Sequence, residues 1–238
     1  MPGLDLKPGA RKLLRDNAPK LFFISIVYIV IVTVMSELNF RLPGTYSAFE
    51  YYYEQFSAGG FTDIGAIYSR FRPSGVPLAI VIWILSAVVD VGYLGYCLKI
   101  SRGRTGEYKD IFDGFLFFGK IVLIKIVTTV LIGLWSLLLV FPGVIAYYRY
   151  SQAYYILLDD PKKGVMQCIG ESKELMLGKK AHLFLLDLSF LGWVILEYLV
   201  AIMIPLPFSL PIVSIWLTPY HSVTRALFYN RAIKTLEM

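Results

Sequence analysis

Long apolar blocks separated by short basic segments are the feature that most restricts what this chain can fold into. Several blocks approach or exceed the roughly 20 mostly apolar residues with which an α-helix spans a bilayer. Only helices and closed barrels satisfy the backbone within lipid, and these blocks lack polar alternation. We therefore predict an all-α, polytopic transmembrane helical bundle of about six spans. The predicted spans cover residues 21–36, 76–98, 121–140, 144–158, 182–204 and 209–228 of a single membrane domain, 1–238.

The composition agrees with a chain embedded in a membrane. Hydrophobic residues make up 57% of the sequence and charged residues 17%, whereas soluble domains hold about 45–50% and about 25%. The net charge is +6, but the Lys and Arg residues are confined to short segments between the apolar blocks. We therefore expect anionic membrane lipids as partners and no nucleic acid.

The distribution of Lys and Arg predicts the orientation in the membrane. The N-terminal flank, residues 99–120, residues 159–180 and the C-terminal tail are rich in Lys and Arg, whereas the charges of residues 37–75 nearly cancel. Because cytoplasmic loops carry the excess of Lys and Arg, we predict that both termini lie on the cytoplasmic side of the cell membrane. Residues 37–75 are then an outer, aromatic-rich loop.

Three of the basic segments carry apolar residues at helical spacing, which predicts amphipathic helices at the membrane surface. A solvated basic tail is an equally good interpretation of the first, residues 4–19, and Asp160-Pro161 predicts the start of the third helix. The predicted apolar faces are Leu6, Ala10, Leu13 and Leu14 in the first segment, Tyr108, Ile111, Phe112 and Phe115 in the second, and Val165, Cys168, Ile169, Ser172, Leu175 and Met176 in the third.

A helix break is predicted inside the apolar stretch 121–158, which is too long for one span. Pro142 removes a backbone donor and Gly143 permits a tight turn, so the two residues predict a hairpin between the third and fourth spans. A single kinked helix is the alternative, but it would be roughly 57 Å long.

Ionisable side chains inside the predicted spans are costly in lipid and are therefore candidates for function. Asp90 in the second span and Arg149 in the fourth lie at depths that permit an ion pair. Such a pair would fix helix packing or relay a proton or substrate, and the packing role is favoured. The other candidates are Asp187, Glu197 and His221.

Two basic residues and a group of tyrosines complete the polar residues of the predicted spans. Lys125 and Arg225 lie close enough to the inner ends to reach the interface. The tyrosine hydroxyls are suited to lining a polar cavity, binding lipid headgroups or joining helices by hydrogen bonds. These tyrosines are Tyr147, Tyr148, Tyr150, Tyr154 and Tyr155.

No metal site or cofactor site is predicted. The two cysteines, Cys97 and Cys168, and the two histidines, His182 and His221, are not clustered at metal-ligand spacing. Both cysteines are predicted at the cytoplasmic face, where a disulfide is not expected.

A motif in the second half of the chain carries a resemblance to a known family. Residues 137–155 read LLLVFPGVIAYYRYSQAYY, and Asp159-Asp160-Pro161 follows soon after. With Pro219-Tyr220 near the C-terminus, this pattern resembles the bacterial membrane-protein family called domain of unknown function 975, from about residue 86 onward. The resemblance implies a membrane topology and no settled biochemical activity.

The sequence ranks functions without fixing one, because it lacks the serine-elbow, zinc-protease, phosphate-loop and dinucleotide motifs of enzymes. The leading hypothesis is a non-enzymatic protein that interacts with lipids or is an accessory component of a membrane complex. The second is a small transporter or permeation unit that uses the intramembrane charges. The third is an intramembrane enzyme with Asp90 and Asp187 as an acid pair, which requires polar groups beside an accessible pocket.

Overall fold

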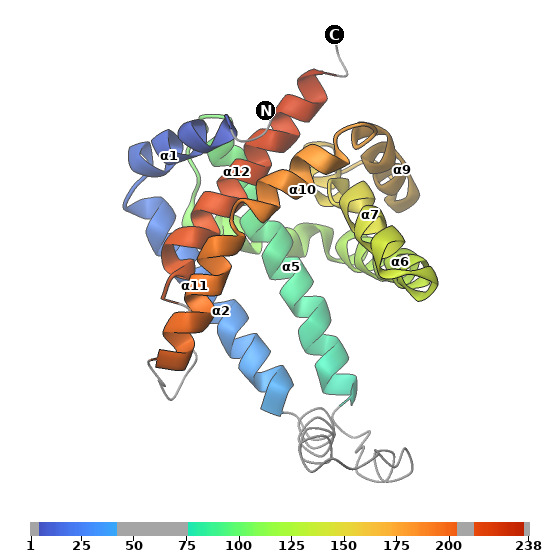
Figure 1. Cartoon of the computed structure of the whole chain (residues 1–238), viewed down its shortest axis with the longest axis horizontal. Coiled ribbons are helices and arrows are strands. Elements are labelled where there is room, and N and C mark those ends of the chain that lie inside the picture. The colour runs from blue at the N-terminus through green and yellow to red at the C-terminus, as the bar shows by residue number, and fades with distance from the viewer. Residues whose placement is uncertain (1–4, 42–75, 204–211, 236–238) are drawn as a thin grey trace. The chain divides into compact units, whose positions relative to one another are not determined.

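The computed structural model describes residues 5–41, 76–203 and 212–235, and every regular element within them is helical (Figure 1). This confirms the all-α prediction for the described part of the chain. The chain divides into two compact units, a larger one of Met1–Ile29 and Ala87–Met238 and a smaller one of Val30–Ser86. Helices α2 and α5 continue from one unit into the other. The elements are α1 (Leu6–Asp16), α2 (Lys20–Arg41), α5 (Val76–Ser101), the 3-10 helix η2 (Tyr108–Phe117), α6 (Phe118–Leu138), α7 (Val140–Tyr150), α8 (Ala153–Asp159), α9 (Val165–Leu175), α10 (Lys180–Leu188), α11 (Leu191–Met203) and α12 (Ser214–Lys234).

Four helical segments of the described residues are long and apolar enough to cross a membrane, which supports the membrane prediction. They are Lys20–Leu38, Pro77–Ser101, Tyr108–Leu138 and Lys180–Val200. The predicted spans 21–36 and 76–98 correspond to α2 and α5. The count of six is not confirmed, because no such segment covers residues 144–158 or 209–228 within the described ranges.

The predicted outer loop 37–75 falls mostly outside the described residues. Its first part is helical, because α2 continues to Arg41.

In the smaller unit, the Ser86 hydroxyl donates to the Ile82 carbonyl at 2.9 Å and contacts the Met35 sulfur at 3.6 Å.

Helix α1 confirms the helical interpretation of the N-terminal segment. Leu6, Ala10 and Leu14 are buried on one face of α1, which packs against α12. Lys7 lies 4.3 Å from the centre of the Phe190 ring. The apolar face of α1 is therefore covered by protein.

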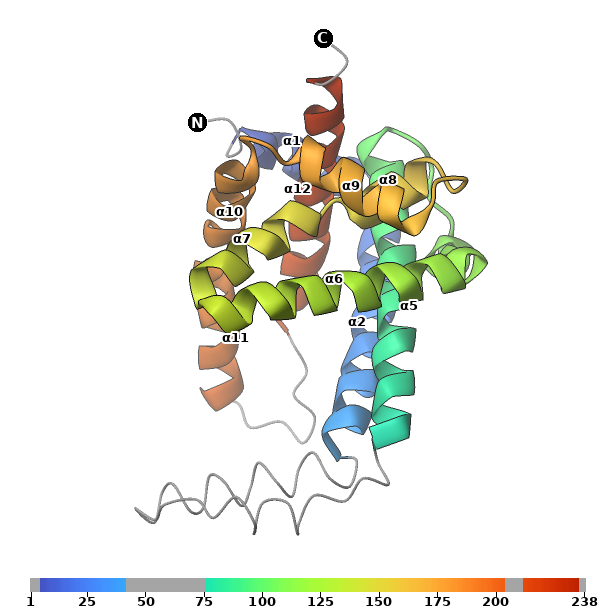
Figure 2. The ribbon, with the colours of Figure 1, turned by 90° about the vertical axis from the view of Figure 1, so that its right-hand side faces the viewer.

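Helices α6 and α7 form the predicted hairpin and lie side by side in Figure 2. The break lies at Leu139, which has an extended backbone, and not at Pro142-Gly143 as predicted. Pro142 is tolerated in the first turn of α7, because N–H groups there have no intrahelical partner. A side chain at Gly143 would collide with the Ser136 hydroxyl, so this glycine permits the close approach of α7 to α6.

Two predicted spans are interrupted helices. The span predicted at 144–158 changes from α7 to α8 at a turn of Ser151 and Gln152. The span predicted at 182–204 changes from α10 to α11 at Ser189 and Phe190, within a segment that is apolar enough to cross a membrane. Apolar content predicted membrane segments here but not the continuity of their helices.

Only Ile111 of the predicted apolar stripe of residues 108–115 is buried against the protein. The segment forms a 3-10 helix, in which residues three apart align, so it buries Asp110, Ile111 and Gly114. A side chain at Gly114 would collide with the Val88 carbonyl of α5. The aromatic residues of the predicted stripe are exposed instead: Tyr108, Phe112 and Phe115.

Helix α9 confirms most of the predicted apolar face of the third basic segment. Cys168, Ile169, Ser172 and Leu175 are buried on it. The helix begins at Val165 and not at the predicted Asp160-Pro161. The Asp160 carboxylate instead accepts a hydrogen bond from the Lys162 backbone N–H at 3.0 Å, which stabilises a turn.

Candidate intramembrane site

A cavity of about 380 Å³ lies in the larger unit among α5, α6, α7, α8 and α12. Three ionisable side chains line it together with tyrosines and small hydroxyl residues. The lining residues are Asp90, Leu94, Lys125, Thr128, Thr129, Ile132, Tyr147, Tyr150, Ser151, Tyr154, Tyr155 and Arg225. Ionisable groups at membrane depth are tolerated where they face one another or a water-filled cavity, and here Asp90, Lys125 and Arg225 line one cavity.

Asp90 and Lys125 place opposite charges on the same cavity wall. The Tyr28 hydroxyl donates to Oδ1 of Asp90 at 2.8 Å, and its ring stacks on Tyr93 with 4.1 Å between centroids. The carboxylate is thus held in one orientation, and both it and Lys125 line the cavity.

Arg225 enters the cavity from α12 and is anchored from behind by α10. Its Nη2 atom lies 3.6 Å from the Asp187 carboxylate, which also lies 2.9 Å from Nε2 of His221. The Nε–H of Arg225 is buried and has no hydrogen-bond partner among the described residues. The Asp187 carboxylate thus balances the charge of Arg225, while one buried N–H of the guanidinium stays unpaired among the described residues.

Two tyrosines of α8 that line the cavity have buried, unpaired hydroxyls. Tyr155 is only 2% exposed, and neither its hydroxyl nor that of Tyr154 has a partner within the ranges that the structure describes. A buried unpaired polar atom typically costs about 1–3 kcal/mol, so proteins seldom keep one without a reason. Several such groups at one cavity identify it as the candidate site.

The break between α7 and α8 forms part of the cavity wall. Tyr150 and Ser151 before the break and Tyr154 after it line the cavity. The Ser172 hydroxyl of α9 accepts a hydrogen bond from the Gln152 N–H at 3.1 Å and donates to the Arg149 carbonyl at 3.0 Å. This fully buried serine satisfies backbone groups that the interrupted helix leaves open.

The predicted pair of Asp90 and Arg149 does not form. Asp90 is hydrogen bonded to Tyr28, and the Arg149 guanidinium lies 5.7 Å from the centre of the Tyr150 ring. Arg149 is absent from the cavity wall, so Asp90 shares the cavity with Lys125 and Arg225 instead.

The other predicted candidates lie outside the cavity. Asp187 and His221 contact each other behind Arg225. Glu197 accepts hydrogen bonds from the Val213 N–H at 3.2 Å and the Ser214 hydroxyl at 2.7 Å. It thereby supports the start of α12, which is a structural role. Asp187 is not among the residues that line the cavity with Asp90.

Sequence reasoning underestimated Lys125 and Arg225, which it placed near the interface. Both line the cavity. Lys125 and Arg225 are far from Asp90 along the chain, so their spacing gave no signal that the three residues share a cavity. The tyrosine-rich segment did give such a signal, because four of its five predicted tyrosines line the cavity.

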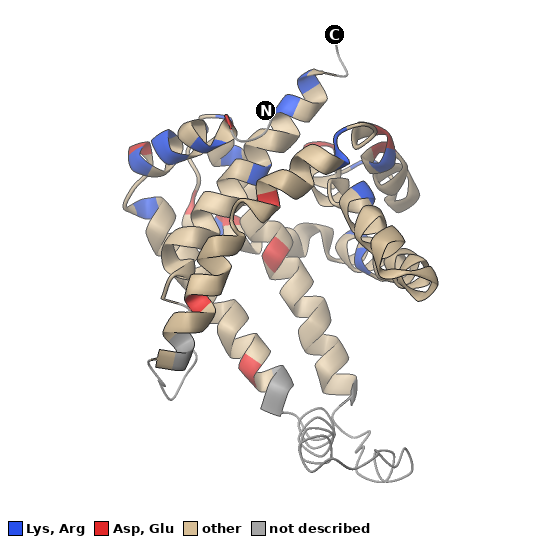
Figure 3. Cartoon of the chain, in the orientation of Figure 1, with Lys and Arg blue, Asp and Glu red and all other residues tan. Residues whose placement is uncertain are grey.

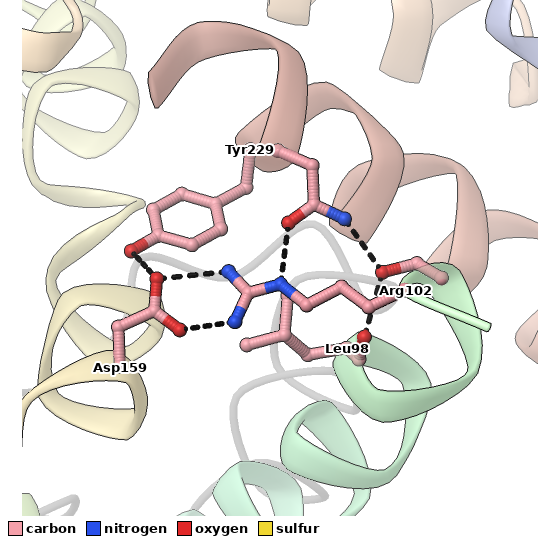
Figure 4. Close-up of polar contacts among 6 residues, drawn as sticks. Leu98, Arg102, Asp159 and Tyr229 are labelled. Atoms are coloured by element: carbon pink, nitrogen blue, oxygen red, sulfur yellow. Dashed lines mark hydrogen bonds and ion pairs between the residues drawn. The ribbon is translucent and has the colours of Figure 1, made fainter. Parts of the chain in front are cut away.

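A second cluster of Arg, Asp and Tyr joins α5, α8 and α12 (Figure 4). Arg102 donates to both oxygens of Asp159 at 2.6 and 2.9 Å and to Asn230 at 2.9 Å. The Tyr229 hydroxyl donates to Asp159 at 2.7 Å, and Asn230 donates to Ser101 at 2.8 Å. The hydrogen bonds to Asp159 raise the pKa of Arg102.

The basic flanks meet at one end of the larger unit. Figure 3 shows Lys and Arg gathered on α1, α9 and the C-terminal part of α12. The contacts among these flanks are Arg231 to Asp5 at 2.7 Å, Arg102 to Asp159 at 2.6 Å, Lys179 to the Ala232 carbonyl at 2.9 Å, and Lys120 to the Lys163 carbonyl at 2.9 Å. In the described part of the chain, no group of three or more His, Cys, Asp or Glu residues is placed to hold a metal.

The described residues form an all-helical fold that contains four segments apolar enough to cross a membrane and a cavity lined by charged residues. Residues 137–237 match the model of the family described as Protein of unknown function (DUF975). This match confirms the resemblance over the C-terminal part of the chain, which includes α7, α8 and α12. No curated protein and no solved structure matches the chain.

Proposed function

We propose that this protein is a small membrane transporter or permeation unit that holds a polar solute in the cavity. The observation that carries the proposal is the wall of the cavity, where Asp90, Lys125 and Arg225 meet buried hydroxyls that have no partner among the described residues. Such groups need water or a ligand to complete their hydrogen bonds. The proposal includes no catalytic step.

The interrupted helices support a transport role. Discontinuous membrane helices often surround transporter substrates, because irregular backbone is tolerated only where protein or a cavity covers it. The α7–α8 break lies on the cavity wall, and the α10–α11 break follows shortly after Asp187, which anchors Arg225.

The same proposal includes an orientation and a topology. The gathered basic flanks support placing both termini in the cytoplasm of a bacterium, because Lys and Arg are retained on that side. In a six-span topology, α12 and the α7–α8 pair provide the further crossings. With 21 residues, α12 is about 32 Å long, and it buries Tyr220, Thr224 and Tyr229 within the protein.

The lipid-interacting or accessory role that ranked first from the sequence is the second candidate. Lys12 and Arg15 are exposed on α1, which favours contact with anionic headgroups. Several other basic residues are already paired within the chain: Lys99 with Asp110 and Asp113, and Lys163 with Glu171. This pairing leaves less positive charge for a lipid surface than the sequence suggested.

Thiol labelling from each side of a membrane tests the transport proposal. Thr129→Cys and Val130→Cys would be prepared with Cys97 and Cys168 replaced by Ser, and each reconstituted in lipid vesicles. Thr129 lines the cavity, whereas its neighbour Val130 is an apolar residue 55% exposed on α6. A charged, membrane-impermeant methanethiosulfonate reagent would be added outside or trapped inside.

The proposal predicts that Thr129→Cys reacts from both sides and that Val130→Cys does not react. Reaction of Thr129→Cys from one side only would contradict the transport proposal. The cavity would then be a binding site that is accessible from one compartment. Equal protection of both cysteines would exclude a hydrated cavity and favour the lipid-interacting role.

A further inference from the structure

We propose that the cavity binds a zwitterion, a small molecule or headgroup that carries both an ammonium group and an anionic oxygen group. The proposal rests on the proposed function, because it names the chemical class of the solute. It is argued from the placement of charges and of unpaired donors around one cavity.

The anionic half of the ligand would lie against α8 and α12. The Arg225 Nε–H and the Tyr155 hydroxyl are buried donors without partners in the part of the chain that the structure describes. A carboxylate or phosphate accepts hydrogen bonds of this kind, and those from a guanidinium are among the strongest in proteins. Both residues line the same cavity.

The ammonium half would lie against Asp90. The Tyr28 hydroxyl donates to Oδ1 of this carboxylate, and Asp90 lines the cavity. A carboxylate only accepts hydrogen bonds and an ammonium only donates them, so the two are complementary. Asp90 also lines a smaller cavity of about 100 Å³ with Lys125 and Tyr154.

The balance of charge favours a ligand with no net charge. Asp90 and Lys125 carry opposite charges on the wall, and Asp187 lies behind Arg225 at 3.6 Å. A lone anion or cation would add an unbalanced charge to this largely desolvated region, which is expensive. The volume of about 380 Å³ lies within the usual range for small-molecule sites.

Two sources supply this chemistry: a free amino acid or similar solute, and the phosphoethanolamine headgroup of a membrane lipid. Each presents a protonated amine and an anionic oxygen group close together. Phosphatidylcholine also carries both charges, but its quaternary ammonium has no N–H to donate to Asp90.

The test measures thermal stabilisation of the full chain in nanodiscs of phosphatidylcholine. The soluble probes are alanine and O-phosphoethanolamine, with acetate and ethylammonium as single-charge controls. A parallel preparation replaces part of the lipid with phosphatidylethanolamine. Because a ligand stabilises the state that it binds, the rise in Tm with concentration gives the apparent affinity.

Two variants and a matched control locate the binding. Tyr155→Phe removes one donor and should weaken zwitterion binding about three- to tenfold. Asp90→Asn should remove the preference for zwitterions over acetate. Tyr229 stacks on Tyr155 with 4.8 Å between centroids, but its hydroxyl is bonded to Asp159. Tyr229→Phe should therefore leave the ligand-induced shift unchanged.

Stabilisation by the soluble zwitterions or by phosphatidylethanolamine supports the proposal, and the responding preparation identifies the source. Equal stabilisation by acetate, equal stabilisation by ethylammonium, or no stabilisation by any zwitterion would overturn it. If one of these results is found and Thr129→Cys is nevertheless labelled from both sides, the transport proposal stands and only the zwitterion is rejected as the ligand.

Discussion

Two clusters of Arg, Asp and Tyr lie one helical turn apart on the same pair of helices. Helix α8 contributes Tyr155 to the cavity and Asp159 to the cluster in Figure 4, and α12 contributes Arg225 and Tyr229 in the same way. The residue types match, but their hydrogen bonding differs.

In the Arg102 cluster, all three guanidinium nitrogens donate and Asp159 accepts with both oxygens. At the cavity, the Nε–H of Arg225 and the hydroxyl of Tyr155 lack partners among the described residues. Paired polar groups stabilise a fold, whereas unpaired buried groups destabilise it. The first cluster therefore joins three helices, and the difference supports the proposal that the second is kept for a ligand.

Removal of Arg102 should cause the largest loss of stability. Arg102→Ala deletes three hydrogen bonds, and since the side chain is partly exposed we expect a loss of about 2–3 kcal/mol. Arg102→Lys should retain only part of the stability, because an ammonium keeps the charge but lacks the two-pronged geometry of a guanidinium. The free energy of unfolding in detergent measures both effects.

Arg104→Ala is the matched control for Arg102→Ala. Arg104 is exposed two residues away, and we expect a change within about 0.5 kcal/mol. An equal loss in both variants would mean that the cluster contributes no specific stability, and the contrast between the two regions would fail.

Replacement of Ser172 should cause the next largest loss of stability, because the Ser172 hydroxyl supports the α7–α8 break beside the cavity. Ser172→Ala leaves the Gln152 N–H and the Arg149 carbonyl without this partner, and we expect a loss of about 1–2 kcal/mol. Thermal denaturation of the purified protein measures it.

Ser136→Ala provides the comparison, since the Ser136 hydroxyl is exposed and bonds only within its own helix at 2.8 Å. We expect almost no change there. If Ser172→Ala is equally neutral, the α7–α8 break is not held by α9, and its link to a substrate site is weakened.

The sequence predicted the membrane class, the α2 and α5 spans, the hairpin and the buried face of α9. These features follow from local length, apolar content and periodicity, which are present in the order of residues. The α7–α8 break could not be predicted in this way. Ser151-Gln152 carries no Pro or Gly, and its support comes from Ser172, about twenty residues later.

The site was only partly predictable for the same reason. Asp90 was selected because a charge in an apolar block is costly wherever it lies. The residues that share its cavity could not be selected, because the sequence placed Lys125 near the interface and made Arg149 the expected partner. Packing places Lys125 on the cavity wall and leaves Arg149 outside it.

The smallest expected change in stability gives the most direct test of the central claim. The claim is that polar groups are left unpaired at the cavity, whereas the same kinds of group are paired in the Arg102 cluster. Tyr155→Phe and Tyr229→Phe each remove one hydroxyl from the same stacked pair of rings. Their free energies of unfolding would be measured side by side without added ligand. We predict that Tyr229→Phe loses about 1 kcal/mol and that Tyr155→Phe loses none or gains stability. Equal losses in both variants would contradict the account, because they would show that the Tyr155 hydroxyl is already paired in the fold.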